Sequence, residues 1–354
     1  MKKITINCEK LNHPNTGLYQ YCANLSTALL AEQPAGFTMQ IYAPLNKASI
    51  YPNGTAIVAS HAWHKLFNPA NYNCHLWHAT NQEKDYFPTR PSVKKVITVH
   101  DLNYFNDPSK ALYKKKRFIS NLQRMIERSD QLVCISEYTL MEIKKHIDIC
   151  IPATVIYNGC NINLNMPRLK PAAAITAPFL FTIGTITDKK NFHVLPALLV
   201  GNHYNLVIAG EVHRPAYQQK IKEAAKRLGV AGRLLFTGAI TEGEKHWYYE
   251  NCVAFAFPSL HEGFGLPVVE AMAFGKPIFL SKETSLPEIG GTDAFYFNDF
   301  EPGNMRQLME DKLDYFDKNQ TAIESKLKER AQTFSWRQAA IQHWKIYEKV
   351  LNGG

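Results

Sequence analysis

The chain has 354 residues, of which 45% are hydrophobic and 20% are charged, and its formal net charge is +9. This length exceeds what one hydrophobic core supports and predicts two domains, while the composition excludes disorder. The longest apolar runs, such as VAFAFP and FLFTIG, have the length of strands and fall short of a membrane span. The N-terminal MKKITINCEK lacks the apolar core of a signal peptide.

The seven cysteines are scattered along the chain and contain no C-x-x-C pair. This pattern argues against structural zinc and a disulfide framework, and it predicts a reducing, cytoplasmic compartment. The positive net charge leaves three kinds of anionic partner to consider: a substrate, a membrane surface or a nucleic acid.

The first half of the chain alternates apolar strands with amphipathic helices. Helices are expected at Leu18–Gln33 and from Glu137 to about His146. The expected strands are Lys3–Cys8, Thr38–Ala43, His75–Ala79, Lys95–His100, Gln131–Ile135 and Thr154–Tyr157. Such alternation predicts an α/β domain with a mostly parallel, doubly wound sheet.

A basic amphipathic helix is expected from Lys110 to Arg128. Its cations are Lys110, Lys114, Arg117, Arg124 and Arg128, and its apolar side consists of Leu112, Phe118, Leu122, Met125 and Ile126. The basic side is either an ordinary solvated face or a surface that meets anionic membrane headgroups or a lipid-diphosphate acceptor. Nucleic acid is not expected as a partner, because no recognisable reading motif accompanies these cations.

The segment from Gly159 to Pro178 is rich in proline and alanine and lacks periodicity, which predicts a linker. The alternating pattern then restarts. Strands are expected at Phe179–Ile183, Asn205–Ala209, Leu234–Thr237, Val253–Phe257 and Pro277–Leu280. A final helix, Phe334–Val350, could close the second domain or cross back to the first.

The most informative segment is HEGFGLPVVEAMAFGKP, residues 261–277. It follows a buried strand, and a helix is expected from Leu266 or Pro267, because proline is favoured in the first turn. The free N–H groups and the dipole of this helix favour an anion in the preceding glycine turn. Glu262 before the turn and Glu270 within the helix can accept hydrogen bonds from hydroxyls. This combination suits a nucleotide-sugar.

Other candidate residues follow predicted strands, at the carboxyl ends where doubly wound sheets bind ligands. They are Gly17, His78, His100 and Asp101 in the first half, and Gly184–Lys190 and Gly210–Glu211 in the second. Their convergence predicts one site between the two domains.

An ordered set of motifs runs along nearly the whole chain: VITVHDL, CISEYT, VIYNG, FTIGTITDKKN, LVIAGE, LLFTGAI and PSLHEGFGLPVVEAMAFGKP. In this order they resemble the retaining family-4 glycosyltransferases of the GT-B fold (glycosyl transferases group 1). The resemblance implies hexose transfer from a nucleoside-diphosphate sugar, with retained anomeric configuration and with no metal or cofactor. The absence of a D-x-D motif agrees with a metal-independent reaction.

The same resemblance implies two Rossmann-like domains that face a cleft. Residues 1–165 would bind the acceptor, residues 166–335 would bind the nucleotide-sugar, and a terminal helix, 336–354, would pack back on the N-terminal domain. The acceptor side would include His78.

The resemblance assigns catalytic roles to Lys190 at the diphosphate, to Glu262 at the sugar hydroxyls and to His100 at the donor sugar. Glu270 matches the residue that holds the ribose hydroxyls, and the base is expected near Ile240. The full expected donor-binding set is Gly17, Thr185, Lys189, Lys190, Ile240, Glu262, Gly263, Phe264, Gly265, Leu266 and Glu270. Each has a structural alternative: loop lysines are commonly exposed, and the two glutamates could cap a turn or oppose a helix dipole.

The sequence departs from the family pattern at two places. Many relatives carry T-G-x-G-R-Y after the first strand, whereas this chain has Tyr19 at the second glycine, which leaves the backbone contact to Gly17. Many relatives also carry Gly-Arg where this chain has Gly184-Thr185. The second change removes a cation from the diphosphate site, and Lys189 is expected to compensate.

The sequence therefore predicts a hexosyltransferase that uses a GDP- or UDP-linked sugar, mannose or similar. Its acceptor would be a saccharide or lipid-linked saccharide in cell-surface polysaccharide or lipopolysaccharide synthesis. The enzyme would be cytoplasmic, with peripheral contact to the inner membrane face through the helix 110–128. An epimerase or phosphorylase of the same fold and a non-catalytic nucleotide-sugar-binding protein stay open as alternatives. A nicotinamide-dependent oxidoreductase is disfavoured, because no G-x-G-x-x-G run follows the first strand.

Overall fold

The structure is a computed structural model that describes residues 1–14, 16–65, 74–82, 86–107, 109–160, 166–172 and 177–353. The chain divides into two compact units. One consists of Met1–Gly159 together with Ser335–Gly354, and the other of Cys160–Phe334. A boundary was expected after residue 165, whereas the units divide after Gly159. Residues 161–165 and residues 173–176 of the expected linker lie outside the described residues.

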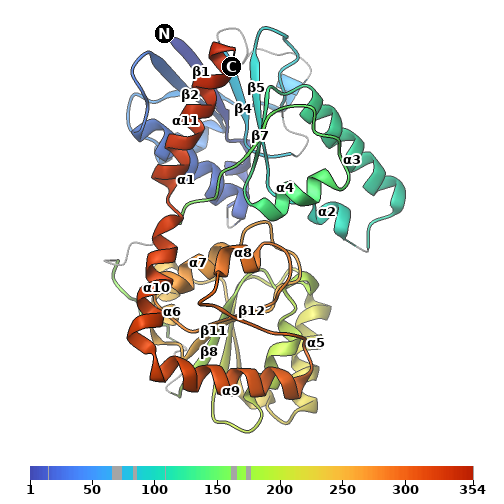
Figure 1. Ribbon diagram of the computed structural model, residues 1–354, viewed down its shortest axis with the longest axis vertical. Coiled ribbons are helices and arrows are strands. Elements are labelled where there is room, and N and C mark those ends of the chain that lie inside the picture. Colours follow the sequence, from blue (N-terminus) through green and yellow to red (C-terminus); the bar gives the residue numbers. More distant parts are fainter. Residues whose placement is uncertain are drawn as a thin grey trace. The chain divides into compact units, whose positions relative to one another are not determined.

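The first unit is built on a parallel sheet with the order β3-β2-β1-β4-β5-β6-β7 (Figure 1). The strands are β1 (Lys2–Asn7), β2 (Phe37–Ala43), β3 (Ala56–Ala59), β4 (Leu76–Ala79), β5 (Lys94–Val99), β6 (Gln131–Cys134) and β7 (Ala153–Val155). The strands expected from the sequence are all present, with small shifts at their ends. The edge strand β3 was not expected.

The helices of the first unit include one that comes from the end of the chain. They are α1 (Gly17–Ala31), α2 (Asn103–Asn106), α3 (Leu112–Glu127), α4 (Glu137–Lys144) and α11 (Trp336–Asn352). The indole Nε1 of Trp344 donates a hydrogen bond to the carbonyl of Leu29 in α1 at 3.0 Å. The terminal helix therefore packs in the first unit, as the family resemblance implies.

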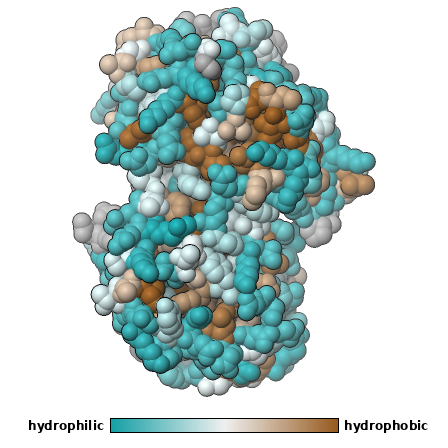
Figure 2. Space-filling view, viewed as in Figure 1, coloured by the Kyte–Doolittle hydropathy of each residue, from teal (hydrophilic) through white to brown (hydrophobic). Residues whose placement is uncertain are grey.

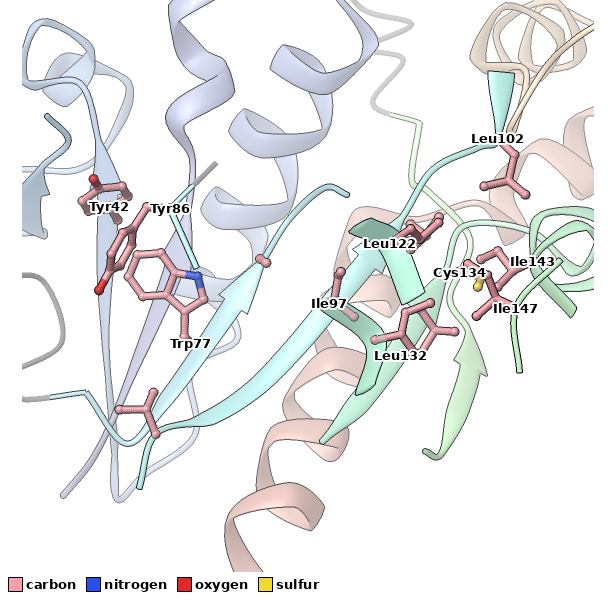
Figure 3. Close-up of a cluster of buried hydrophobic side chains, with 14 of the residues drawn as sticks. Tyr42, Trp77, Tyr86, Ile97, Leu102, Leu122, Leu132, Cys134, Ile143 and Ile147 are labelled. Carbon is pink, nitrogen blue, oxygen red and sulfur yellow. The ribbon is translucent and has the colours of Figure 1, made fainter. Parts of the chain in front are cut away.

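One face of this sheet carries a buried apolar cluster that fixes α3 and α4. Figure 3 shows Leu122 of α3 and Ile143 of α4 among buried side chains of the sheet, such as Ile97 and Leu132. Burial of these side chains holds α3 by the apolar side expected from the sequence. Leu112 was expected on this side but is 66% exposed, because it lies at the first position of α3, away from the cluster.

The second unit is also built on a parallel sheet, with the order β10-β9-β8-β11-β12-β13 (Figure 1). Its strands are β8 (Phe179–Ile183), β9 (Asn205–Ala209), β10 (Leu234–Gly238), β11 (Ala254–Phe257), β12 (Ile278–Leu280) and β13 (Phe295–Tyr296). Its α-helices are α5 (Pro215–Arg227), α6 (Glu242–Asn251), α7 (Leu266–Ala273), α8 (Leu286–Gly290), α9 (Pro302–Lys318) and α10 (Gln320–Thr333). The strands expected for this half are present, and β13 is additional.

Candidate functional site

The strand order of the second unit reverses between β8 and β11. Such a reversal opens a crevice at the carboxyl ends of the two strands, and ligands bind there in doubly wound sheets. The segment 184–190 follows β8, and the segment 258–265 follows β11. The main chain joins these segments, because the carbonyl of Lys189 accepts hydrogen bonds from Leu260 N at 2.8 Å and Ser259 Oγ at 3.2 Å.

Lys190 and Glu262 form an ion pair at this reversal point. Lys190 Nζ lies 2.6 Å from Glu262 Oε1, and the two side chains are 11% and 13% exposed. Ser259 Oγ donates to the same carboxylate oxygen at 2.6 Å. The ammonium of Lys190 also lies 4.7 Å from the centre of the Phe257 ring. The structure thus brings together two residues that stand far apart in the sequence.

The surroundings of Glu262 keep its carboxyl group ionised. Burial alone would raise the pKa of Glu262, but the charges of Lys190 and Lys189 and the hydrogen bonds from Lys190 and Ser259 outweigh burial and lower it. Within the described residues both donors bind Oε1, so Oε2 keeps its capacity to accept a hydrogen bond from a ligand hydroxyl.

Gly184 gives Lys190 the room to reach Glu262. Its φ is +150°, and a Cβ at this position would lie 3.1 Å from Cε of Lys190. A side chain here would therefore press on the lysine stem and would also strain the backbone. Thr185 follows as a half-buried residue, and its carbonyl accepts a 3.4 Å hydrogen bond from the hydroxyl of Thr187.

The glycine turn leads directly into α7, which begins at Leu266 with a proline in its first turn, as expected. Gly265 has a φ of +103° as the N-cap residue. The hydroxyl of Ser285 fixes the turn by donating to the carbonyls of Glu262 at 3.1 Å and Phe264 at 3.0 Å. Phe264 is buried and packs edge-on against Phe334, so its side chain supports the turn.

Glu270 lies in the middle of α7 and is held by two residues of α6. Lys245 Nζ donates to its Oε1 at 2.6 Å, and the hydroxyl of Tyr249 donates to its Oε2 at 2.9 Å. Burial lowers the pKa of Lys245, but the charges of Glu270 and Glu242 outweigh burial and raise it above its ordinary value. Burial and the Glu270 carboxylate raise the pKa of Tyr249. Both side chains are therefore protonated donors.

Sequence reasoning missed Lys245, Tyr249 and Ser259. No spacing rule links α6 to α7, so only the fold reveals which α6 side chains reach Glu270. Ile240, expected near the base, lies half-buried after β10 and two residues before α6 begins. Ile240 therefore lies just before the helix whose Lys245 and Tyr249 contact Glu270.

In the first unit, His100 follows β5 and is nearly buried. Its Nε2 donates to the carbonyl of Thr80 at 2.7 Å, and its ring lies edge-on to Tyr21 with 4.5 Å between ring centres. Gly17 is the first residue of α1, where Thr16 caps the helix, and a Cβ on Gly17 would meet open space. The strand order reverses between β1 and β4. Thr80 directly follows β4, whereas Gly17 comes after β1 and the 3-10 turn Glu9–Asn12.

His78 has the environment of a core residue. It is fully buried, with Nδ1 at 2.7 Å from the Tyr347 hydroxyl and Nε2 at 2.8 Å from the hydroxyl of Thr98. Burial, together with the nearby His343 and His100, lowers the pKa of His78 well below its ordinary value. Both ring nitrogens are engaged inside the unit, and an acceptor contact at His78 stays a prediction.

Two kinds of feature are absent from the part of the chain that the structure describes. No cluster of three or more histidine, cysteine, aspartate or glutamate side chains there has the arrangement of a metal site. No helix there combines the length and the apolar character that a bilayer span requires.

The two halves of the chain match two family models. The model described as Glycosyltransferase Family 4 matches residues 21–164. The model described as Glycosyl transferases group 1 matches residues 168–333. Together they cover every strand except β1, and they include Lys190, Glu262 and Glu270.

Two bacterial relatives carry mannosyltransferase names. The serotype-specific mannosyltransferase WbdA of Escherichia coli is 31% identical over 277 residues, which are 70% of this chain and 32% of that protein. The O-antigen chain mannosyltransferase RfbU of Salmonella typhimurium is 23% identical over 313 residues, which are 83% of this chain and 86% of that protein. The chain thus spans about a third of the length of WbdA.

Solved structures share the fold over the whole chain. Sucrose-phosphate synthase from Thermosynechococcus elongatus has a TM-score of 0.76 at 16% identity, with 100% of each chain covered. Anabaena Alr3699/HepE in complex with UDP and glucose has a TM-score of 0.73 at 14% identity, with 99% of this chain and 100% of that chain covered. At these identities the likeness shows the fold, which is GT-B.

Proposed function

This chain belongs to the family-4 glycosyltransferases, and we propose that it transfers a hexose, mannose or a similar sugar, from a GDP- or UDP-linked donor to a saccharide acceptor. The observation that carries the proposal is the buried Lys190–Glu262 pair beside the N-terminus of α7. It sets one cation and one hydroxyl acceptor next to helix N–H groups, and a sugar diphosphate needs all three.

The donor is proposed to lie along the strand ends of the second unit. Its diphosphate meets the ammonium of Lys190 and the main-chain N–H groups of the turn 263–266. A hydroxyl of the hexose donates to Glu262 Oε2, which the described residues leave to a ligand. The ribose hydroxyls donate to Glu270, and the base rests near Ile240. Lys189 and Thr185 border the diphosphate.

The proposed reaction is a front-face transfer that retains the anomeric configuration. The bond between the anomeric carbon and the phosphate oxygen breaks, and the acceptor oxygen forms its bond to the same face of that carbon. The acceptor proton passes to the departing diphosphate. Lys190 and the α7 N–H groups stabilise the growing charge of that group without a metal. For His100 and Gly17, donor contacts are proposed from the family resemblance alone.

The names of the relatives favour mannose and a cell-surface glycan. WbdA and RfbU are both named as mannosyltransferases, and RfbU is named for the O-antigen chain. We therefore propose that the acceptor is a saccharide or lipid-linked saccharide of a lipopolysaccharide, elongated in the cytoplasm.

A panel of UDP, GDP, ADP and their hexose conjugates identifies the donor by thermal shift, because a ligand of the native state raises the melting temperature. We expect one nucleotide and its sugar to give the largest shift. NMR of the product then reads the anomeric configuration. An inverted product would contradict the retaining mechanism, and the absence of any shift would contradict the donor site.

Three rival functions are separated by product analysis. An epimerase converts the nucleotide-sugar without an acceptor, whereas the proposed enzyme requires one. A phosphorylase requires inorganic phosphate and releases a sugar phosphate. A non-catalytic binding protein gives the thermal shift but releases no nucleoside diphosphate when the acceptor is present.

A further inference from the structure

The first turns of α3 form an exposed surface that combines apolar and basic side chains. We define the α3 tip as Leu112, Tyr113, Lys114, Lys116 and Arg117. Leu112 and Tyr113 are 66% and 67% exposed, although the far end of the same helix is anchored in the core by Leu122 and Ile126. In Figure 2 hydrophobic surface borders hydrophilic surface at the right-hand edge, where Figure 1 places the start of α3.

The cations of the α3 tip do not serve the stability of the helix. The first turn of α3 contains no acidic residue, and the run from Lys114 to Arg117 lies near the positive end of the helix dipole. Cations at that end destabilise a helix. Among the described residues none of the four cations from Lys114 to Arg117 forms an ion pair, and the nearest basic neighbour that does is Lys110, with Asp107 at 3.7 Å. Their charge is therefore available to an external anion.

A shallow hollow of about 390 Å³ continues this surface along α3. Its lining consists of Phe105, Lys116, Ile119, Ser120, Gln123 and His146. A phosphate in this hollow could contact the ammonium of Lys116 and the hydroxyl of Ser120, beside the apolar side chain of Ile119. The hollow thus extends the mixed apolar and cationic character beyond the helix end.

From these features we propose that the α3 tip and the adjacent hollow dock on a bilayer that contains anionic phospholipids. Lys114, Lys116 and Arg117 meet the headgroup phosphates, and Leu112 and Tyr113 enter the boundary between headgroups and acyl chains. A protein partner fits less well, because the centres of protein interfaces are depleted in lysine. This docking goes beyond the proposed sugar transfer and does not depend on it.

The test measures flotation of the full chain with phosphatidylcholine vesicles, with and without phosphatidylglycerol, at low and high salt. We expect recruitment to the anionic vesicles alone, and salt weakens it. The double variant Lys114→Gln/Lys116→Gln should bind roughly 25-fold more weakly, since each cation near an anionic surface contributes about five-fold. The variant Leu112→Ser/Tyr113→Ser should bind these vesicles about ten-fold more weakly, because it loses the apolar side chains that enter the bilayer.

The matched control is Lys220→Gln/Lys226→Gln, which removes two exposed lysines from α5. It should bind like the wild type, and all variants should keep the wild-type melting temperature and nucleotide-dependent thermal shift. Equal recruitment to neutral vesicles, an equal loss in the α5 control or full binding by Leu112→Ser/Tyr113→Ser would each overturn the proposal. Failure of the donor panel with intact flotation would instead reject only the proposed function.

Discussion

At the residue scale, a contribution to the stability of the fold does not explain why the Lys190–Glu262 pair is buried. A buried ion pair gives little net stabilisation, because removing both charges from water offsets their attraction. Its position beside the first turn of α7 gives it a chemical use, since Lys190 can stabilise the departing diphosphate. We expect Lys190→Ala to lower the turnover number by roughly 10²–10³. Steady-state assays of nucleoside diphosphate release measure this loss.

The control for this prediction is Lys220→Ala, which removes an exposed lysine of α5. It should keep wild-type turnover. Lys190→Ala also leaves Glu262 buried without its cation, so the melting temperature must be recorded with the rate. Full activity of Lys190→Ala would exclude the assigned role.

Lys245 contacts Glu270 in the structure, although the sequence did not predict it as a site residue. With Tyr249 it fixes both oxygens of Glu270, so we expect Lys245→Met to weaken nucleoside diphosphate binding about ten-fold. The loss should act through the ribose hydroxyls. Calorimetry with the preferred nucleotide and its 2′,3′-dideoxy analogue should show that the difference between the two ligands shrinks in Lys245→Met.

Glu242→Gln is the matched variant for Lys245. Glu242 pairs with Lys245 at 3.0 Å but does not contact Glu270, and its side chain is 60% exposed. It should keep most of the discrimination between the two nucleotides. If the wild type binds both equally, the ribose role of Glu270 is wrong; if Lys245→Met keeps the wild-type discrimination, only the role of Lys245 is wrong.

At the element scale, the sequence predicts most of the strands but misses two that lie at sheet edges. The strand β3 is only partly buried, and β13 has two residues, which is too few for a pattern to emerge. The start of α7 at Leu266 was predictable, because a glycine turn and a proline mark it. The exposure of Leu112 was not, because helical periodicity assigns a face but does not tell where the underlying core ends.

The turn before α7 depends on Gly265. Its φ of +103° is a backbone conformation that residues with a side chain rarely adopt. In addition, a Cβ at this position would lie 3.0 Å from Cδ2 of Leu286. We expect Gly265→Ala to lower the free energy of unfolding by about 1–3 kcal/mol and to weaken donor binding. Chemical denaturation and the thermal shift with the preferred nucleotide measure the two effects.

Gly232→Ala is the control for Gly265. Its Cβ would meet open space and its φ is not positive, so its stability should stay within about 0.5 kcal/mol of the wild type. Wild-type stability of Gly265→Ala would show that the turn does not require this backbone conformation.

At the scale of the whole molecule, the first unit is discontinuous in sequence. Its final helix, α11, arrives after the entire second unit and supplies Tyr347 to the core. Helical periodicity predicted a helix here but did not tell which domain it packs in. Only the family resemblance implied that it packs back on the first domain. For the same reason the sequence did not reveal the surroundings of His78: this residue lies within β4, and the helix that covers it comes from the end of the chain.

The bond between His78 and Tyr347 links residues 269 positions apart and tests this view of the first unit. Tyr347→Phe keeps the ring but leaves Nδ1 of a buried imidazole without its partner, which costs about 1–3 kcal/mol. Because the two units need not unfold together, hydrogen exchange of the α11 amides is the appropriate measure. We expect faster exchange there and an unchanged KM for the acceptor. Tyr315→Phe, at a 51% exposed tyrosine, should change neither. A raised KM with wild-type exchange in Tyr347→Phe would instead return His78 to the acceptor site.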